Sequence, residues 1–238
     1  MSNRPPITLR YFDARGRAQF LRYYFYIRDI QFSDERVAVG DNFAAWQAIR
    51  DDRSLTGPFH KLPVLQYGDR LVPETLLIAS FVHEVLGDAG SIPDEDNMRH
   101  GMLTSSLIQD VMSPIGMLLW AEVLFPGVDV AAVAKRTLER LHQHCRAIEQ
   151  SLIEWRWQER TRRRRVMLAD CLLWEELNVA TQVFGPHFSF AATPLLQSFH
   201  EEFSGRERCE ALLRDQPCPI TARPNESAAI EAIQRSLG

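Results

Sequence analysis

The hydrophobic pattern of this chain changes its period near Gly87. Before that glycine, short strand-like runs alternate with a helical run, at residues 7–12, 15–28 and 31–37. After it, the strand pattern fades and long runs of helical periodicity follow. A strand, a helix and a second strand in succession indicate a parallel pair of strands. The sequence therefore predicts a small α/β domain followed by an all-helical domain.

Turn-forming residues set the expected borders of the two domains. Thr75 opens a predicted helix that ends before Gly87, a residue type that often stops helices. Glycine, aspartate, serine and proline then gather in a short segment that is typical of a linker. The expected division is an α/β domain over residues 1–86, a linker over 87–95, and a helical domain with a C-terminal tail over 96–238.

Other elements follow from the same periodicities. The first domain should also contain a short helix over residues 42–50 and a hairpin of strands 64–67 and 71–72 around Gly68-Asp69. The second should contain long helices over 103–119, 130–157 and 168–184, a helix that begins at Thr193-Pro194, and a last helix over 226–237. The pattern assigns no role to the tail that begins at Pro217.

Composition narrows the class of protein. A chain of 238 residues can bury a full core without disulfides or metals. Its net charge of −4 argues against a nucleic-acid partner. No apolar run approaches ~18 residues, so we expect no membrane span, and the first residues lack the apolar segment of a signal peptide. The four cysteines show neither a CxxC pair nor metal-ligand spacing, which favours reduced thiols, a cytoplasmic location and no metal site.

Four short segments of the first domain carry a specific family pattern. They are Tyr11-Phe12-Asp13-Ala14-Arg15-Gly16-Arg17-Ala18, then Trp46 with Arg50, then Phe59-His60-Lys61-Leu62-Pro63-Val64-Leu65, and finally Val72-Pro73-Glu74-Thr75. In this order they resemble the cytosolic glutathione transferases of the tyrosine-using sigma/mu/pi/alpha branch, and the sigma type most. The resemblance implies a thioredoxin-like domain followed by a helical one, with glutathione as co-substrate. It covers the helical half only loosely, through Ala169-Asp170.

The first segment supplies the expected catalytic groups. A phenol O–H that faces a thiol stabilises the thiolate by hydrogen bonding, and a nearby cation acts in the same direction. The resemblance implies that Tyr11 has the first role, while Arg15 supplies positive charge in the same turn. The alternative for Tyr11 is an aromatic side chain that merely packs at a strand end. The RGRA sequence that follows it favours the catalytic interpretation.

The remaining segments are expected to hold glutathione itself. The resemblance assigns the glycine carboxylate to Trp46 and Arg50, and adds Lys61 to the binding residues. It implies a cis bond before Pro63 that turns the Leu62 backbone toward the cysteine amide. It gives the γ-glutamyl end to two residues at a helix start, where free N–H groups suit a carboxylate. These are Glu74, for the ammonium group, and Thr75, for the carboxylate.

Several positions depart from the family pattern. His60 replaces a glycine, residues 51–57 form a longer stretch, and the region 99–106 lacks the acid that reaches a partner subunit. Met167 stands where a serine or threonine usually caps the central helix, although Asp170 could still accept a backbone N–H. The first domain contains no cysteine, so the reactive sulfur must come from the ligand.

The leading hypothesis is a detoxification enzyme, a homodimer that conjugates the glutathione thiolate to small hydrophobic electrophiles. Phe59 is the candidate anchor for the partner subunit. One alternative is a glutathione-binding or scaffold protein with little turnover, and another is a glutathione-dependent isomerase or peroxidase. Arginines at 160 and 162–165 leave open a module that binds an anion or nucleic acid, but a solvated loop between helices is the preferred interpretation because the overall charge is negative.

Overall fold

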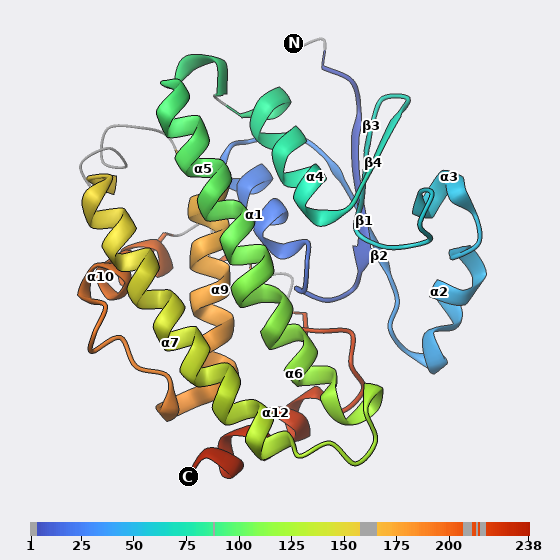
Figure 1. Ribbon diagram of the computed structural model, residues 1–238. Coiled ribbons are helices and arrows are strands. Elements are labelled where there is room, and N and C mark those ends of the chain that lie inside the picture. The colour runs from blue at the N-terminus through green and yellow to red at the C-terminus, as the bar shows by residue number, and fades with distance from the viewer. Residues whose placement is uncertain (1–3, 88, 158–165, 207–210, 213, 215–217) are drawn as a thin grey trace.

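The computed structural model describes residues 4–87, 89–157, 166–206, 211–212, 214 and 218–238. Figure 1 shows a small sheet with its helices beside a larger group of helices. This arrangement confirms the fold class predicted from the sequence. The arginine run lies outside the described residues.

The N-terminal part contains a four-stranded sheet in the order β2-β1-β3-β4. Strands β1 and β2 are parallel, and the other neighbours are antiparallel. Helices α1 and α4 lie on one side of the sheet, and α2 and α3 lie on the other (Figure 1). The elements are β1 (Ile7–Phe12), α1 (Gln19–Ile27), β2 (Ser33–Val37), a 3₁₀ turn (Asp41–Phe43), α2 (Ala44–Ile49), α3 (Arg53–Thr56), β3 (Val64–Tyr67), β4 (Arg70–Pro73), α4 (Thr75–Phe81) and a π-helical turn (Val82–Leu86).

The helical part is organised around α9. A 3₁₀ turn (Ala89–Ser91) precedes one long run that comprises α5 (Asp94–Ser106), a π-helical turn (Leu107–Met112) and α6 (Ser113–Leu124). Helix α7 (Val130–Glu154) returns beside it, and α9 (Leu168–Phe184) is buried along most of its length at the centre (Figure 1). A 3₁₀ turn (Gly185–His187), α10 (Pro194–Ser204) and α12 (Glu226–Leu237) complete the described helices. Because α1 packs directly on α9, the two parts share one core.

The long run of α5 and α6 is long and apolar. By length and composition alone, residues 94–124 could cross a membrane. A core helix of a globular fold satisfies the same test, and here α5 packs against α9 while α6 packs against α7.

The register of the sheet assembles one edge. Arg10 of β1 lies opposite Val64 of β3, and Val64 lies opposite Pro73 of β4. The last residues of β1, the segment before β3 and the segment after β4 therefore meet at the same edge. The sheet thus gathers three of the four sequence segments singled out above.

Most predicted elements are confirmed, but the helix expected over 103–119 is part of the longer run over 94–124, and the helix expected over 42–50 begins as a 3₁₀ turn. Two further differences have a visible cause. Helix α1 begins at Gln19 rather than at residue 15, because residues 13–18 form a turn whose Arg15 and Gly16 N–H groups donate to the carbonyls of Pro219 and Ile220. Helix α3 was not expected, and its first turn forms because the Asp52 side chain accepts the Ser54 N–H.

Candidate functional site

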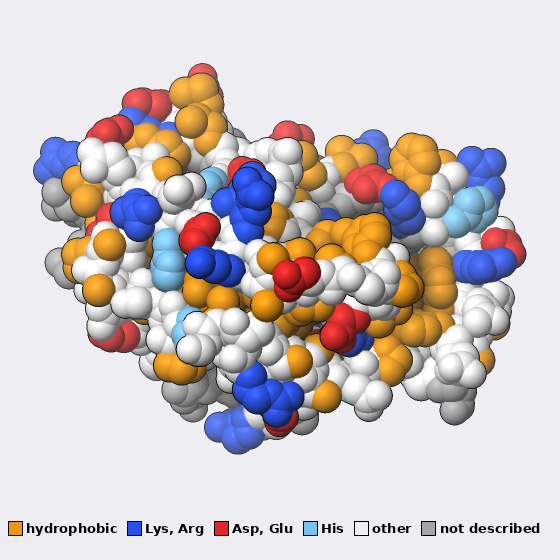
Figure 2. Space-filling model, turned by 60° about the horizontal axis from the view of Figure 1, so that its bottom comes forward, with side chains coloured by type: hydrophobic (Ala, Val, Ile, Leu, Met, Phe, Trp, Pro, Cys, Tyr) orange, Lys and Arg blue, Asp and Glu red, His pale blue; other side chains and the backbone are white. Residues whose placement is uncertain are grey.

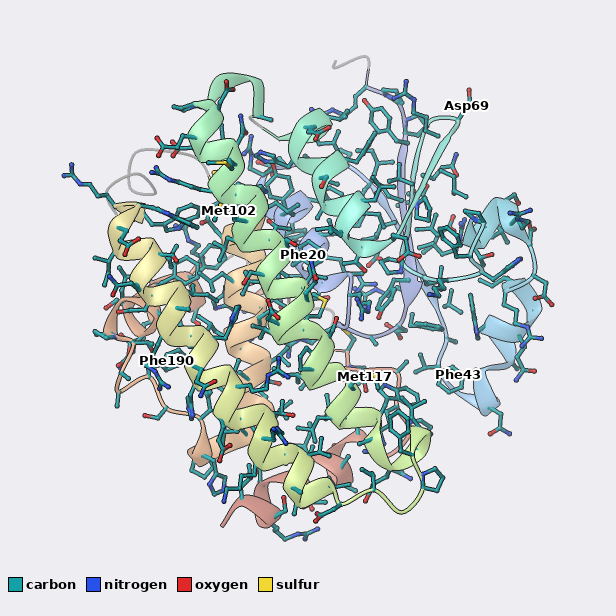
Figure 3. All side chains as sticks on the ribbon, in the orientation of Figure 1. Phe20, Phe43, Asp69, Met102, Met117 and Phe190 are labelled. Carbon is teal, nitrogen blue, oxygen red and sulfur yellow. The ribbon has the colours of Figure 1, made fainter. Side chains whose placement is uncertain are left out.

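A cavity of about 360 Å³ lies between the N-terminal and helical parts. Tyr11 and Leu62 line it from the sheet side, and apolar side chains of α6 line it from the other. Figure 2 shows hydrophobic side chains gathered around a hollow between the helices and the part of the molecule that carries α2 and α3. In Figure 3, Met117 of α6, which lines the cavity, and Phe43 lie on facing sides of this region.

Tyr11 is held tightly at the floor of the cavity. Its side chain is 8% exposed, and its hydroxyl oxygen accepts the backbone N–H of Arg17 at 3.1 Å. Burial raises the pKa of Tyr11, so the hydroxyl keeps its proton at neutral pH. Among the described residues no acceptor takes that proton, which leaves it available to a ligand in the cavity.

The turn after β1 requires a glycine at position 16. Gly16 has φ of 35°, and a Cβ at this position would lie 2.4 Å from the Tyr11 hydroxyl oxygen. A larger residue would therefore displace the hydroxyl. The close approach of the Tyr11 hydroxyl thus explains why the RGRA sequence has a glycine at position 16.

Arg15 lies elsewhere than the sequence suggested. Its guanidinium is buried and forms a fork with the Glu175 carboxylate of α9 at 3.0 and 2.9 Å, and it also donates to Gln182 at 3.1 Å. Arg15 is not among the residues that line the cavity, because these bonds draw its side chain toward α9. The cation at the cavity is Arg17, whose guanidinium donates to the Ser113 hydroxyl at 3.1 Å.

The segments before β3 and after β4 carry the residues expected to bind glutathione through their backbone. The cis bond between Leu62 and Pro63 is confirmed, and Leu62 lines the cavity. Thr75 is buried at the first position of α4, and exposed Glu74 precedes it with φ of 67°. No side chain caps this end of α4, so the start of the helix has free N–H groups near the sheet edge.

The third group of expected residues is far more exposed. Trp46 packs edge-to-face on Phe12 with ring centroids 5.5 Å apart, and α2, which carries it, buries no residue. The Arg50 side chain is 55% exposed and lies 3.4 Å from the Asp51 carboxylate. Lys61 is exposed as well. None of the three lines the cavity, and together they are called the lip.

His60 has a backbone conformation that most residues rarely adopt. Its φ is 52°, in the region that favours glycine, and its Nδ1 lies 2.8 Å from the Arg50 carbonyl oxygen. The side chain therefore joins the segment before Pro63 to the end of α2.

Two groups of residues that line the cavity were not predicted from the sequence. The tail contributes Ile220, Thr221 and Ala222 to the lining, and Arg223 fastens it by donating to the Leu119 carbonyl at 2.8 Å. The Pro219 and Ile220 carbonyls also accept backbone N–H groups of the turn after β1, and such bonds leave no periodic pattern in the sequence. Glu176 of α9 also lines the cavity, hidden within a strongly apolar helix.

Two further expectations concern α9 and metals. The Asp170 carboxylate accepts the Met167 N–H at 2.8 Å, as the sequence suggested. Within the described ranges, no three histidine, cysteine, aspartate or glutamate side chains gather in a way that could hold a metal ion.

Comparison with known proteins gives relatives for up to half of the chain. No family model matches the chain. The hematopoietic prostaglandin D synthase of Gallus gallus is 32% identical over 119 residues, which are 50% of this chain and 53% of that protein. A glutathione S-transferase of Plasmodium falciparum is 34% identical over 77 residues, 32% of this chain and 36% of that protein. S-crystallin SL11 of Nototodarus sloanii also matches, at 30% identity over 87 residues. The matches span about half, or less, of these relatives.

Solved structures share the whole fold. NaGST-2 superposes with a TM-score of 0.71 at 19% identity, over 91% of this chain and 99% of that one. Rat hPGDS complexed with a quinoline gives a TM-score of 0.64 at 21% identity, over 91% and 100% of the two chains. Na-GST-3 of Necator americanus, described as monomeric, gives 0.70 at 19% identity, over 89% and 98%. These likenesses establish the fold, a thioredoxin-like domain joined to a helical one.

Proposed function

We propose that this chain is a glutathione transferase that conjugates glutathione to small hydrophobic electrophiles. The observation that carries the proposal is the cavity, which brings an available tyrosine hydroxyl together with an apolar wall. Its volume of about 360 Å³ is in the range of small-molecule sites.

In the proposed mechanism the Tyr11 hydroxyl donates a hydrogen bond to the glutathione sulfur. A free thiol has a pKa of about 8.5 and is mostly protonated at neutral pH. Hydrogen bonding to the charged form lowers that pKa and raises the fraction of thiolate. The thiolate then attacks an electrophilic carbon held by α6, α9 and the tail, and a carbon–sulfur bond forms. The charges of Arg17 and Arg22, rather than that of Arg15, act on the Tyr11 hydroxyl and oppose the rise of its pKa.

The rest of glutathione would lie along the sheet edge. We assign the cysteine amide to the Leu62 backbone beside Pro63, and the γ-glutamyl end to Glu74 and Thr75 at the start of α4. The glycine carboxylate would reach the exposed lip. That lip consists of Trp46, Arg50 and Lys61. Arg15 has a positioning role in this scheme, because its bonds to Glu175 fix the turn that follows Tyr11.

Calorimetry and kinetics test the proposal together. Purified protein should bind glutathione in a calorimetric titration, and it should accelerate product formation from a panel of electrophiles only when glutathione is present. Binding without acceleration of any electrophile would instead support a glutathione-binding or scaffold protein with little turnover.

Relatives that are named as a synthase, rather than as a transferase, favour a second candidate. In it the same thiolate serves a glutathione-dependent isomerisation or peroxidase reaction. Consumption of glutathione separates these possibilities. Conjugation uses one glutathione for each product, a peroxidase yields oxidised glutathione, and an isomerase consumes none.

A homodimer is part of the proposal. Phe59 is 61% exposed just before β3, and exposed apolar side chains also occur on α4 and α5, including Leu77 and Met102. Figure 3 shows Met102 on the outer run of α5. Exposed aromatic side chains of this kind often anchor interfaces. Sedimentation should give twice the chain mass, and Phe59→Ala should weaken the association. A wild-type monomer at micromolar concentration would refute the homodimer.

We further propose a cytoplasmic location. Cys145 and Cys218 are free thiols, as expected in a reducing compartment. Cell fractionation tests this, and recovery of the protein in a membrane or secreted fraction would contradict it.

A further inference from the structure

The apolar cavity contains one acid that the proposed mechanism does not use. Glu176 of α9 is 2% exposed and lines the cavity, together with Tyr11. Among the described residues its carboxyl group makes no hydrogen bond and no ion pair. Buried polar groups in proteins nearly always have a partner, so this one requires an explanation.

The adjacent residue shows what a structural acid looks like in this helix. Glu175 is equally buried, but its two carboxylate oxygens accept a fork of hydrogen bonds from Arg15. Neighbouring residues of a helix point in different directions. Glu175 thus holds the two parts of the molecule together, whereas Glu176 faces the space where a substrate would lie.

The surroundings of Glu176 favour its neutral form. Burial and then the charge of Glu175 raise the pKa of Glu176 well above its ordinary value, while Arg15 and Arg17 act in the opposite direction. A neutral carboxyl has one O–H donor. An unpaired charge would be far more costly in an apolar cavity than this neutral acid.

We propose that Glu176 is a proton donor that directs the cavity toward electrophiles whose oxygen gains negative charge during the reaction, namely apolar conjugated carbonyl compounds. This inference rests on the proposed function, since it needs the glutathione thiolate in the same cavity.

The chemistry balances without a further reagent. The thiolate attacks the β-carbon of the conjugated carbonyl compound, and a carbon–sulfur bond forms as the carbon–carbon double bond shifts its electron pair toward the carbonyl oxygen. That oxygen takes the proton of the Glu176 carboxyl. The resulting enol becomes the ketone by proton exchange with water, and Glu176 recovers its proton from water.

The test compares two electrophiles in the wild type and in Glu176→Gln. An apolar conjugated ketone needs a proton at oxygen, whereas a chlorodinitrobenzene loses chloride and needs none. Glutamine has the size of the neutral acid and keeps a hydrogen-bond donor, but it cannot transfer a proton. We expect the ratio of kcat for the ketone to kcat for the haloarene to fall about tenfold or more, since general acids contribute roughly 10²–10⁴-fold. The KM for the ketone should change little.

A second variant and a pH profile guard against a merely structural effect. Glu176→Met removes the donor and should also raise the KM for the ketone. In the wild type, the ratio of ketone to haloarene rates should fall as pH rises through the pKa of Glu176, because the acid loses its proton. In Glu176→Gln that dependence should vanish. The charged or titratable groups near Glu176, which are Tyr11, Arg15, Arg17 and Glu175, are the same in both proteins.

The outcomes are distinguishable. If the wild type binds no glutathione or converts neither electrophile, the proposed function fails and this inference fails with it. If the wild type converts both and Glu176→Gln leaves their ratio and its pH profile unchanged, Glu176 is not a proton donor, while the transferase proposal stands.

Discussion

The candidate glutathione site has two ends that are built differently. At the sulfur end, Tyr11 is buried, bonded to the Arg17 N–H, and confined by Gly16. At the end proposed for the glycine carboxylate, the Arg50 side chain is 55% exposed, and the preceding helix α2 has no buried residue. The first end is fixed by the protein itself. The second presents charged groups that a ligand would have to order.

The difference follows from what holds each end. The sulfur end lies where β1, β3 and the start of α4 meet, and the tail closes over it through backbone bonds to Arg15 and Gly16. The lip depends on local bonds such as the contact of His60 with the Arg50 carbonyl. Substitutions at the sulfur end should therefore alter folding or turnover, and substitutions at the lip should alter affinity alone.

The largest effect should come from Arg15→Ala. Removal of the guanidinium leaves the buried Glu175 carboxylate without its partner, and breaking a buried pair in this way costs about 3–5 kcal/mol. Denaturant unfolding should show a loss of that size in the free energy of unfolding. The control is Arg50→Ala, whose exposed ion pair should contribute at most about 1 kcal/mol. Equal stability of the two variants would refute the division into a fixed end and an open end.

Gly16→Ala should affect both folding and catalysis. A β-carbon would lie 2.4 Å from the Tyr11 hydroxyl oxygen, on a residue with φ of 35°. We expect a stability loss of about 1–2 kcal/mol from the backbone. Turnover should fall roughly tenfold to a hundredfold, because displacement of a catalytic group by about 1 Å has such effects. The control is Gly40→Ala, since nothing lies within 4 Å of a β-carbon there. Unchanged turnover in Gly16→Ala would remove the hydroxyl from the mechanism.

These two substitutions also mark where sequence reasoning succeeds and where it stops. The bounds of β1 and α9 were predictable because their hydrophobic periods are regular, and the cis bond before Pro63 followed from a local motif. The position of Arg15 was not predictable, because its partner Glu175 lies 160 residues away. The tail likewise reaches the cavity through Pro219 and Ile220 carbonyls, and backbone bonds leave no trace in side-chain patterns.

Tyr11→Phe should change chemistry more than stability, with a loss of about 1 kcal/mol because the Arg17 N–H loses its acceptor. The hydroxyl is lost while the buried ring keeps its packing, so glutathione affinity should remain similar. The ultraviolet absorbance of the bound thiolate should appear at a pH higher by about one unit, which corresponds to ~1.36 kcal/mol. Turnover at neutral pH should fall about tenfold. An unmoved titration would show that the phenol does not stabilise the thiolate.

The smallest expected effect is that of Arg50→Ala on glutathione binding, and it tests the open end directly. A hydrogen bond to a charged group contributes about 1.5–3 kcal/mol when it is shielded, but Arg50 is 55% exposed and is already paired with Asp51, so its contribution should be at or below the lower limit. Calorimetry should show an affinity loss of about tenfold or less, and added salt should narrow the gap between variant and wild type because exposed charges are screened. The control is Arg53→Ala, which removes an exposed arginine from neighbouring α3 without touching the proposed site. An equal loss of affinity in both variants would mean that the lip attracts glutathione only by its general charge. A loss confined to Arg50→Ala, with unchanged turnover at saturating glutathione, would place the glycine carboxylate at the open end. It would also leave the chemistry to the buried end.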